Sequence, residues 1–576
     1  MTLRTLTLAL TSLLASQALA HEPLRVLYDQ KCSTRDGVKL SSDVYLPTAP
    51  GRYPVILVRS PYNKVSDRVL DKARYFTSKG YAYVYQDVRG RGDSDGVFVP
   101  YRNEGRDGYD AIEWAAAQPW SNGKVGTLGG SYLGRAQWLA ALQRPPHLIT
   151  MVALVTPSDP FVEWPTGVPI PMHLSWLHYV SGRINQNIKG VNWSQLYHHL
   201  PLIDMDDASG RPIPTWDEEI RHSGLSAWWD PIRYQNRYEQ VGVPVLHISG
   251  WYDDEQVGTP LNFANMRKRG GTAHARANQR LLMGPWPHRV NSTSKLAEVD
   301  FGKNAIIDLK DYQRRWFDLW LKGLDDGIGA EPPVRIFVMG DNRWRDENEW
   351  PLARAKPTKY YLHSRGRANS RFGNGLLSRR SPRKEPADSY RYDPADPVPF
   401  ITDPEFSQIG SADDYRAVER RDDVLVYTSE PLKQRLEVTG PLTMVLYASS
   451  SAPDTDFTAK LLDVWPNGYA QRLSDGLVRA RYRRGLDREV FLKPGNIYRF
   501  EIDLWNTSQA FLPGHRIRVE IASSAFPKYD RNLNTNAPLG RSTQMRIAKQ
   551  RVLHTGRYPS HMLLPVIPNA ESRVSR

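Results

Sequence analysis

Short apolar strands alternate with helix-like segments over residues 25–155, and this alternation restricts the possible folds strongly. The runs Tyr53–Val58 and Tyr81–Tyr85 are bounded by Gly and Pro, as is typical of buried parallel strands. Residues 106–118 and 131–143 have the apolar spacing of amphipathic helices. The succession of strands and helices predicts an α/β fold built on a parallel sheet.

The alternation stops at about residue 158. Residues 158–241 contain six tryptophans and many prolines but no strand periodicity, so we expect an inserted helical cap that supplies aromatic walls to a pocket. Strand-like runs return at Val243–Ser249 and Arg280–Met283. The α/β domain is therefore predicted to comprise residues 21–157 and 242–330.

The pattern changes again after Pro332 and Pro333. Short alternating strands separated by turn residues follow, beginning with Val334–Met339, as an all-β sandwich requires. We predict a β-sandwich domain over residues 331–576, with a long surface loop at residues 364–395.

Residues 1–20 have the pattern of a cleaved export signal. One basic residue, Arg4, precedes an apolar run through Leu14, and Ala18-Leu19-Ala20 fits a signal-peptidase site. The apolar run is too short to span a bilayer, so no stable membrane insertion is expected. The sequence thus predicts an exported protein, periplasmic or secreted, that begins at His21.

The net charge of +14 raises the question of a nucleic-acid partner. We find no zinc-finger, RNP or helix-turn-helix pattern, and basic residues are scattered among acidic ones. A solvated basic surface without nucleic-acid binding is therefore predicted. Cys32 is the only cysteine, which excludes an intrachain disulfide and any metal site built from several cysteines.

The segment from Gly129 to Gly134 contains a candidate nucleophile, Ser131. It lies between a predicted strand and a predicted helix, where a tight turn projects a serine hydroxyl over the C-terminal edge of the sheet. The usual elbow is Gly-x-Ser-x-Gly, but here the glycine after the serine falls one place later. A simple strand-to-helix turn is the alternative interpretation.

A nucleophilic serine needs a base, and the base needs an orienting carboxylate. On an α/β-hydrolase sheet these follow the serine in the order Asp or Glu, then His. Asp253 and Asp254 come just after one predicted strand, and His288 comes just after the next. We predict a triad of Ser131, Asp253 and His288, and spacing alone leaves Asp254 open as the carboxylate.

With these motifs, the sequence resembles the family of serine hydrolases that includes cocaine esterase, α-amino acid ester hydrolases and Xaa-Pro dipeptidyl peptidases. The resemblance extends over essentially all of the predicted mature chain. It implies an α/β-hydrolase core, a helical cap and a C-terminal all-β jelly-roll domain. The matching segments are Arg59–Tyr62, Asp87–Gly96, Gln118–Gly126, Gly130–Gly134, Gly250–Asp253 and Gly284–His288.

The resemblance also implies a role for each matching residue. Ser131 would be the nucleophile, His288 the general base and then acid, and Asp253 the residue that orients it. The Tyr62 hydroxyl and the Tyr132 amide would form the oxyanion hole. The family uses no metal or cofactor, and its members often assemble, which leaves a homo-oligomer open.

Lys64 departs from the family pattern. Amino acid ester hydrolases bind the substrate ammonium with carboxylates, one of which lies two residues after the oxyanion tyrosine, where this chain has Lys64. A cation there would favour an anionic or neutral acyl group. Trp164 and Trp176 are further predicted substrate contacts. Carboxylates of the cap could replace the missing one, at Asp204, Asp206 or Asp207.

The resulting hypothesis is an exported serine hydrolase that cleaves small-molecule carboxylic esters, or amides, through an acyl-enzyme. An α-amino acid ester hydrolase or acylase, or an Xaa-Pro dipeptidyl aminopeptidase, would use the same triad. Two hypotheses from other functional classes are a non-catalytic carbohydrate-binding protein and a metallo-hydrolase that uses His198, His199 and the cap aspartates. The motif His-Glu-x-x-His is absent, which disfavours the metallo-hydrolase.

Overall fold

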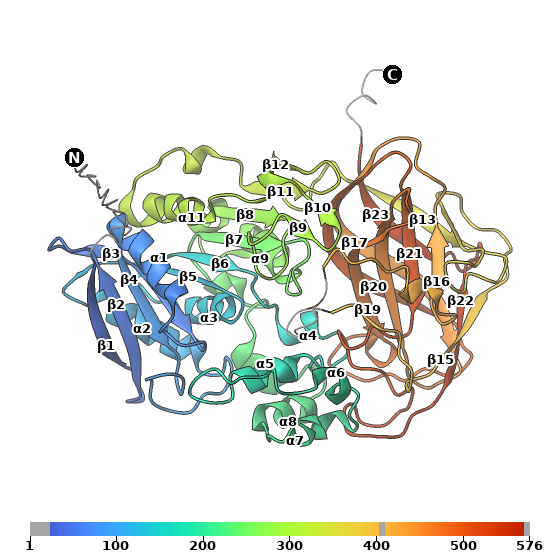
Figure 1. The fold of residues 1–576 in the computed structure, drawn as a ribbon, viewed down its shortest axis with the longest axis horizontal. Coiled ribbons are helices and arrows are strands. Elements are labelled where there is room, and N and C mark those ends of the chain that lie inside the picture. Colours follow the sequence, from blue (N-terminus) through green and yellow to red (C-terminus); the bar gives the residue numbers. More distant parts are fainter. Residues whose placement is uncertain (1–23, 403–408, 410, 569–576) are drawn as a thin grey trace, which may run out of the picture.

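The computed structural model of the protein describes residues 24–402, 409 and 411–568. An α/β part lies on one side, a β-rich part on the other, and a group of short helices lies below and between them (Figure 1). The predicted signal segment at residues 1–20 is outside the described residues. Among the helices of the described chain, none is both long and apolar enough to cross a membrane.

The α/β part is built on a ten-stranded mixed sheet with the order β1-β2-β4-β3-β5-β6-β7-β8-β11-β12. Its strands from β4 to β11 pair in parallel, whereas β1, β2 and β12 pair antiparallel at the edges. The predicted α/β fold is confirmed. The strands are β1 (Arg25–Ser33), β2 (Lys39–Leu46), β3 (Tyr53–Ser60), β4 (Ala82–Asp87), β5 (Ser121–Gly130), β6 (Leu148–Leu154), β7 (Val245–Gly250), β8 (Gln279–Gly284), β11 (Val334–Val338) and β12 (Arg343–Glu347).

Helices cover both faces of this sheet. Alternate residues of β3 point to opposite faces, so Val55 joins the core under α2, α3 and α9, whereas Ile56 joins the core under α1 and α11. The central strands are therefore buried on both sides, which explains their continuous apolar runs. The helices are α1 (Asp67–Ser78), α2 (Glu104–Ala116), α3 (Tyr132–Ala141), α9 (Gly258–Arg269), α10 (Ala273–Ala277) and α11 (Leu309–Phe317).

The chain between β6 and β7 forms the cap, which contains short helices and no strand. Trp216 and Ile220 of the cap pack in one apolar cluster with Phe526 and Tyr529 of the β-rich part. The cap thus contacts the β-rich part as well as the sheet that it interrupts. Its helices are α4 (Pro160–Glu163), α5 (His173–Tyr179), α6 (Trp193–Leu196), α7 (Met205–Ala208) and α8 (Pro214–Arg221).

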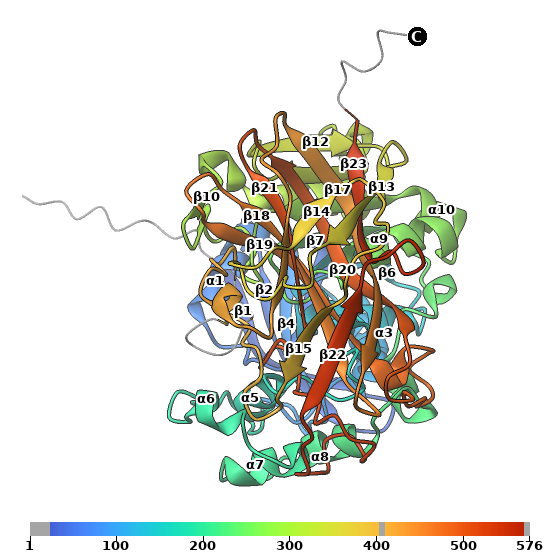
Figure 2. The ribbon, with the colours of Figure 1, turned by 90° about the vertical axis from the view of Figure 1, so that its right-hand side faces the viewer.

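The β-rich part contains an eleven-stranded sheet system whose strands face the viewer in Figure 2. Its longest strand, β17, pairs with β20, β22 and β23, and alternate β17 residues such as Leu442, Met444 and Leu446 fill the core. The strands are β13 (Lys356–His363), β14 (Leu376–Ser378), β15 (Asp388–Tyr392), β16 (Leu425–Thr428), β17 (Leu436–Ser450), β18 (Asp456–Val464), β19 (Ala470–Arg479), β20 (Tyr498–Phe511), β21 (Arg516–Ala522), β22 (Ala548–Leu553) and β23 (His561–Ile567).

Two details of the predicted C-terminal part are wrong. The run 334–339, predicted as the first sandwich strand, is β11, and it pairs in parallel with β8 of the α/β sheet. Because β11 is only five residues long, its pattern does not distinguish the two kinds of sheet. The predicted loop at 364–395 contains β14 and β15, and β15 pairs with β22. The α/β sheet therefore extends past residue 330.

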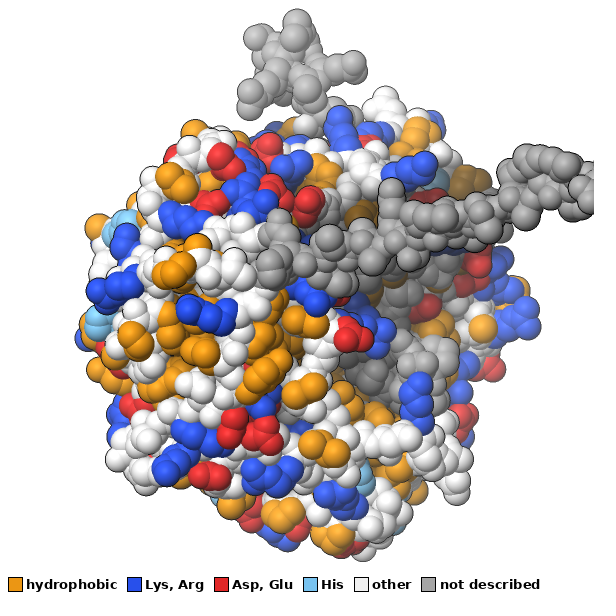
Figure 3. Space-filling model, turned by 60° about the vertical axis from the view of Figure 1, so that its left-hand side comes forward, with side chains coloured by type: hydrophobic (Ala, Val, Ile, Leu, Met, Phe, Trp, Pro, Cys, Tyr) orange, Lys and Arg blue, Asp and Glu red, His pale blue; other side chains and the backbone are white. Residues whose placement is uncertain are grey.

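Basic side chains are dispersed over the face of the molecule shown in Figure 3. They lie among acidic, apolar and uncharged side chains instead of forming one continuous basic surface there. On this face, the positive net charge is therefore distributed as expected for a solvated surface.

Candidate active site

Ser131 lies in the turn between β5 and α3, in a strained backbone conformation. Its φ of 58° and ψ of −129° are rare for a residue with a side chain. The turn also needs Gly134, because a Cβ at that position would lie 2.6 Å from Thr156 Oγ1 and 3.0 Å from the Leu154 carbonyl oxygen. The close approach of α3 to β6 thus holds Ser131 at the C-terminal end of the sheet.

Tyr132 is the first residue of α3, so its backbone N–H has no acceptor within the helix. The buried side chain fixes this residue: the hydroxyl donates to Glu104 Oε1 at 2.8 Å, and the ring stacks on Tyr101 with centroids 4.2 Å apart. Glu104 in turn pairs with Arg59 at 2.7 Å. An N–H donor next to Ser131 is therefore held in place.

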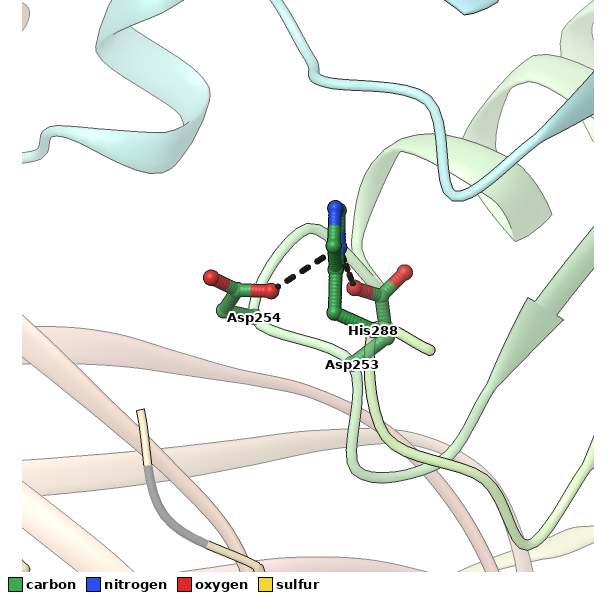
Figure 4. A group of neighbouring side chains, drawn as sticks. All are labelled: Asp253, Asp254 and His288. Carbon is green, nitrogen blue, oxygen red and sulfur yellow. Dashed lines mark hydrogen bonds and ion pairs between the residues drawn. The ribbon is translucent and has the colours of Figure 1, made fainter. Parts of the chain in front are cut away.

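His288 and Asp253 follow neighbouring strands and meet. His288 comes after β8 and Asp253 after β7, and His288 Nδ1 lies 2.8 Å from Asp253 Oδ1. The second oxygen of Asp253 accepts from Ser249 Oγ at 2.6 Å. Figure 4 shows the other ring nitrogen of His288 directed away from the carboxylates, which leaves it available for proton transfer.

Two further carboxylates surround the same imidazole. Asp254 Oδ1 is 3.1 Å and Glu255 Oε2 is 3.9 Å from His288 Nδ1, but neither oxygen forms a hydrogen bond with a described residue. Asp253 is thus the carboxylate with hydrogen-bond geometry. Burial lowers the pKa of His288, but the negative charges of Asp254 and Glu255 outweigh it and hold the pKa well above its usual range.

Ser131 and His288 line one cavity of about 130 Å³. Its walls come from three parts of the chain: the α/β part, the cap and the β-rich part. The predicted contacts Trp164 and Trp176 both line it from the cap, and Trp505 lines it from the β-rich part. The cavity is therefore closed by segments that lie far apart in the sequence.

Tyr62 lies after β3, where its hydroxyl oxygen accepts a hydrogen bond from Trp176 Nε1 at 3.0 Å. This contact orients the phenol and leaves its proton free to be donated. Burial raises the pKa of Tyr62 to about 12, against the opposite effect of hydrogen bonds with Trp176 and Ser131. The phenol thus stays protonated at neutral pH and is a suitable donor to an oxyanion.

Lys64 is placed differently from its prediction. Its buried ammonium forms a short ion pair with Asp93 and lies 3.7 Å from Asp43 and 3.8 Å from Asp87. It does not belong to the lining of the cavity that Ser131 and His288 share. These neighbours compensate its charge, so the placement contradicts the prediction that Lys64 contacts the substrate.

Apart from Asp254 and His288, the charged residues that line the cavity have no counterpart in the predicted site. Glu163 and Glu219 contribute carboxylates from the cap, and Glu255 and Asp254 from the loop after β7. Glu255 could have been found, since it lies two residues from Asp253. Glu163 had no local signal, nor had the cationic residues of the lining, Arg135 and Lys528.

The buried carboxyl groups of this cavity have altered acidities. Burial raises the pKa of Glu163 to about 8, although the charge of Arg135 opposes this effect. Burial also raises the pKa of Glu255 well above its usual range, with the charge of His288 opposing it. Burial therefore favours the neutral form of both groups.

The rival metal site in the cap is not assembled. Arg531 donates to His198 Nδ1 at 2.9 Å, and Asp206 accepts from the backbone N–H of Ile213. Within residues 24–402, 409 and 411–568, one group of at least three potential metal ligands lies together: Asp253, Asp254 and His288, with ligand atoms within 4.8 Å of one another. A metal there would compete for the imidazole nitrogen that contacts Asp253.

Comparisons with known proteins agree with this architecture. Residues 36–290 match the X-Pro dipeptidyl-peptidase (S15) family, and residues 326–563 match the X-Pro dipeptidyl-peptidase C-terminal non-catalytic domain. Cocaine esterase of Rhodococcus sp. (strain MB1 Bresler) is 38% identical over 570 residues, which cover 92% of this chain and 97% of that protein.

Solved structures extend the similarity to the whole fold. An α-amino acid ester hydrolase superimposes with a TM-score of 0.83 at 26% identity, over 96% of this chain and 100% of that one. An aminopeptidase from the marine sediment archaeon Thaumarchaeota archaeon gives a TM-score of 0.82 at 25% identity, over 98% and 99% of the two chains.

Proposed function

Because the chain belongs to the serine hydrolase family of cocaine esterase and the S15 X-Pro dipeptidyl-peptidases, and is thus an enzyme that hydrolyses esters, we propose that Ser131, His288 and Asp253 are its catalytic triad. The observation that carries this proposal is the 2.8 Å contact between His288 Nδ1 and Asp253, beside a cavity that Ser131 shares. The predicted use of this triad thus has a geometric basis.

In the proposed reaction, Ser131 Oγ attacks the ester carbonyl carbon and transfers its proton to His288 Nε2. The carbonyl oxygen becomes an oxyanion that accepts hydrogen bonds from the Tyr62 hydroxyl and the Tyr132 N–H. His288 then protonates the departing alcohol, which leaves an acyl group on Ser131. Water, activated by the same imidazole, releases the acid and restores the serine.

Covalent labelling is the direct test of this proposal. A fluorophosphonate should modify Ser131, located by mass spectrometry of the digested protein. Labelling should fall to background in a variant without the serine hydroxyl. Modification at another residue, with Ser131 unlabelled, would contradict the proposed nucleophile.

Replacing Tyr62 by phenylalanine is expected to lower kcat by about 10²–10³-fold, because one oxyanion donor is lost while the ring is retained. KM should change little, since the donor acts mainly on the charge that develops in the transition state. Steady-state hydrolysis of a p-nitrophenyl ester measures both constants. Tyr179, whose ring packs 6.0 Å from that of Tyr62, provides the control Tyr179→Phe. Equal effects of the two replacements would remove Tyr62 from the oxyanion hole.

Replacing Asp254 by asparagine is expected to move the acid limb of the kcat/KM–pH profile to lower pH. His288 must be neutral to accept the serine proton, and the raised pKa of His288 keeps it protonated to higher pH. Despite its burial, Asp254 has a lowered pKa because of the charge of His288, so it is ionised in this range. Removing its negative charge lowers the pKa of His288, so activity should appear earlier as the pH rises. The control is Glu219→Gln. Glu219 also lines the cavity, but the histidine that its carboxylate contacts is His173, at 3.2 Å, and not His288. An unchanged or upward-shifted limb in Asp254→Asn would contradict this account.

A second candidate function is hydrolysis of an aminoacyl ester or amide. The carboxyl groups of Glu163 and Glu255 favour it, because a substrate ammonium in this cavity would stabilise their ionised forms. Comparing aminoacyl p-nitrophenyl esters with their N-acetyl forms tests this candidate, since only the first carry the charge. A preference for the N-acetyl forms would reject it.

Export is also part of the proposal. It is supported by the sequence of residues 1–20 alone, and it places the enzyme in the periplasm or outside the cell.

A further inference from the structure

A second cavity, of about 400 Å³, lies where α2 begins, α3 ends and the cap returns to the sheet. Three arginines line it: Arg102, Arg106 and Arg237. Among the described residues that form its wall there is no aspartate or glutamate, and the other polar side chains are the amides of Asn103 and Gln143. All the charged side chains in the wall of this cavity are therefore cationic.

Arg102 makes its contacts with uncharged groups. Its Nη1 donates to the Trp228 carbonyl oxygen at 2.7 Å, and its guanidinium carbon lies 3.7 Å from the centre of the Trp228 ring. Its buried Nη2 has no hydrogen-bond partner within the described chain. A donor of this guanidinium thus remains unused.

The acidic residues whose charges act on Arg102 are Glu218 and Glu219, and each lies close to another side chain. Glu218 lies 3.3 Å from Arg221, and Glu219 lies 3.2 Å from His173. Burial lowers the pKa of Arg102 in spite of these two charges. The negative charges of Glu219 and Glu218 therefore do not offset the effect of burial on the Arg102 guanidinium.

Arg237 is in the same situation. Its Nη2 donates to the carbonyl oxygens of Asp230, at 3.1 Å, and Arg233, and not to a carboxylate. The carboxylates of Asp159 and Asp230 lie closer to Arg233, at 3.4 and 3.2 Å. Burial lowers the pKa of Arg237 as well.

Arg106 completes the set. It is exposed, on the first turn of α2, and its side chain forms no ion pair or hydrogen bond with any residue that the structure describes. Three guanidinium groups without a carboxylate partner thus share one cavity. Arg479, by contrast, pairs with both Asp456 and Asp530.

We propose that this cavity binds an oxyanion of the phosphate or sulfate type. Guanidinium groups present paired N–H donors that match the oxygens of such a group, and a bound anion would supply the missing counter-charge. The site is separate from the catalytic cavity, since none of its three arginines lines that cavity. An anion here would join the start of α2 to the chain that leaves the cap.

Calorimetric titration of the full-length protein with inorganic phosphate tests the proposal, with sodium chloride used to keep the ionic strength constant. Wild-type protein should bind phosphate, and Arg106→Gln and Arg237→Gln should each weaken the affinity by about tenfold. Arg144→Gln is the matched control, because Arg144 is exposed near the end of α3 but does not line this cavity. It should change the affinity less than about twofold.

Glycerol 3-phosphate provides a second arm of the same titration. Tighter binding than inorganic phosphate would identify a phosphate ester as the preferred ligand, and weaker binding would identify the free anion. Ester hydrolysis and the unfolding temperature should stay close to wild type in Arg106→Gln, whose side chain forms no hydrogen bond or ion pair within the described chain. Absence of phosphate binding in the wild type, or equal losses in Arg106→Gln and Arg144→Gln, would overturn the proposal whether or not Ser131 is the nucleophile.

Discussion

Replacing Ser131 by alanine is expected to lower kcat for ester hydrolysis by about 10⁶-fold. Without the hydroxyl no acyl-enzyme can form, and the remaining rate should come from substrate binding and the oxyanion donors alone. Hydrolysis of a p-nitrophenyl ester by purified protein measures the loss, with active-site titration of the wild type to correct for inactive enzyme.

The control for this variant is its stability. Alanine is smaller than serine and Ser131 Oγ faces a cavity, so the unfolding temperature should change by only a few degrees. A folded Ser131→Ala protein that keeps more than a few per cent of wild-type turnover would reject acyl transfer through this residue.

Replacing Asp253 by asparagine is expected to lower kcat by about 10⁴-fold. The asparagine amide can present its N–H₂ group to Nδ1, which favours the wrong tautomer of His288 and removes the charge that stabilises the imidazolium. Asp253 is fully buried between Ser249 and His288, so no water molecule can easily replace its carboxylate.

Asp254→Asn is the matched comparison, because Asp254 is as close as 3.1 Å to the same nitrogen but lacks hydrogen-bond geometry. We expect a loss below about tenfold when each variant is assayed at its own optimal pH. If Asp254→Asn lost as much activity as Asp253→Asn, the orienting role would belong to Asp254 or be shared by the pair.

The positions of Ser131, Asp253 and His288 could be predicted because they depend on chain order alone. Each follows a strand of one parallel sheet, and β5, β7 and β8 end at the same edge. Residues that directly follow such strands lie at the same edge of the sheet, whatever the conformation of the loops between them. The α/β fold could be predicted because its strands and helices have clear periodicities in the sequence.

Other features depend on packing that no local pattern records. Lys64 lies two residues after Tyr62, the predicted oxyanion donor, yet its side chain is directed to three aspartates outside the cavity. Lys528 comes from the far end of the chain and lines the cavity. The short β11 could have joined either sheet, and its partner β8 was not evident from its own five residues.

The three-part wall of the cavity at Ser131 has a consequence for how this enzyme can diversify. Lys528, Tyr529 and Trp505 belong to the region that matches a domain described as non-catalytic, yet they face the same space as the proposed nucleophile, Ser131. Mutations there can select among substrates without touching the atoms that break bonds. Evolution can therefore retune what the enzyme accepts in one half of the gene while the reactive machinery in the other half stays constant.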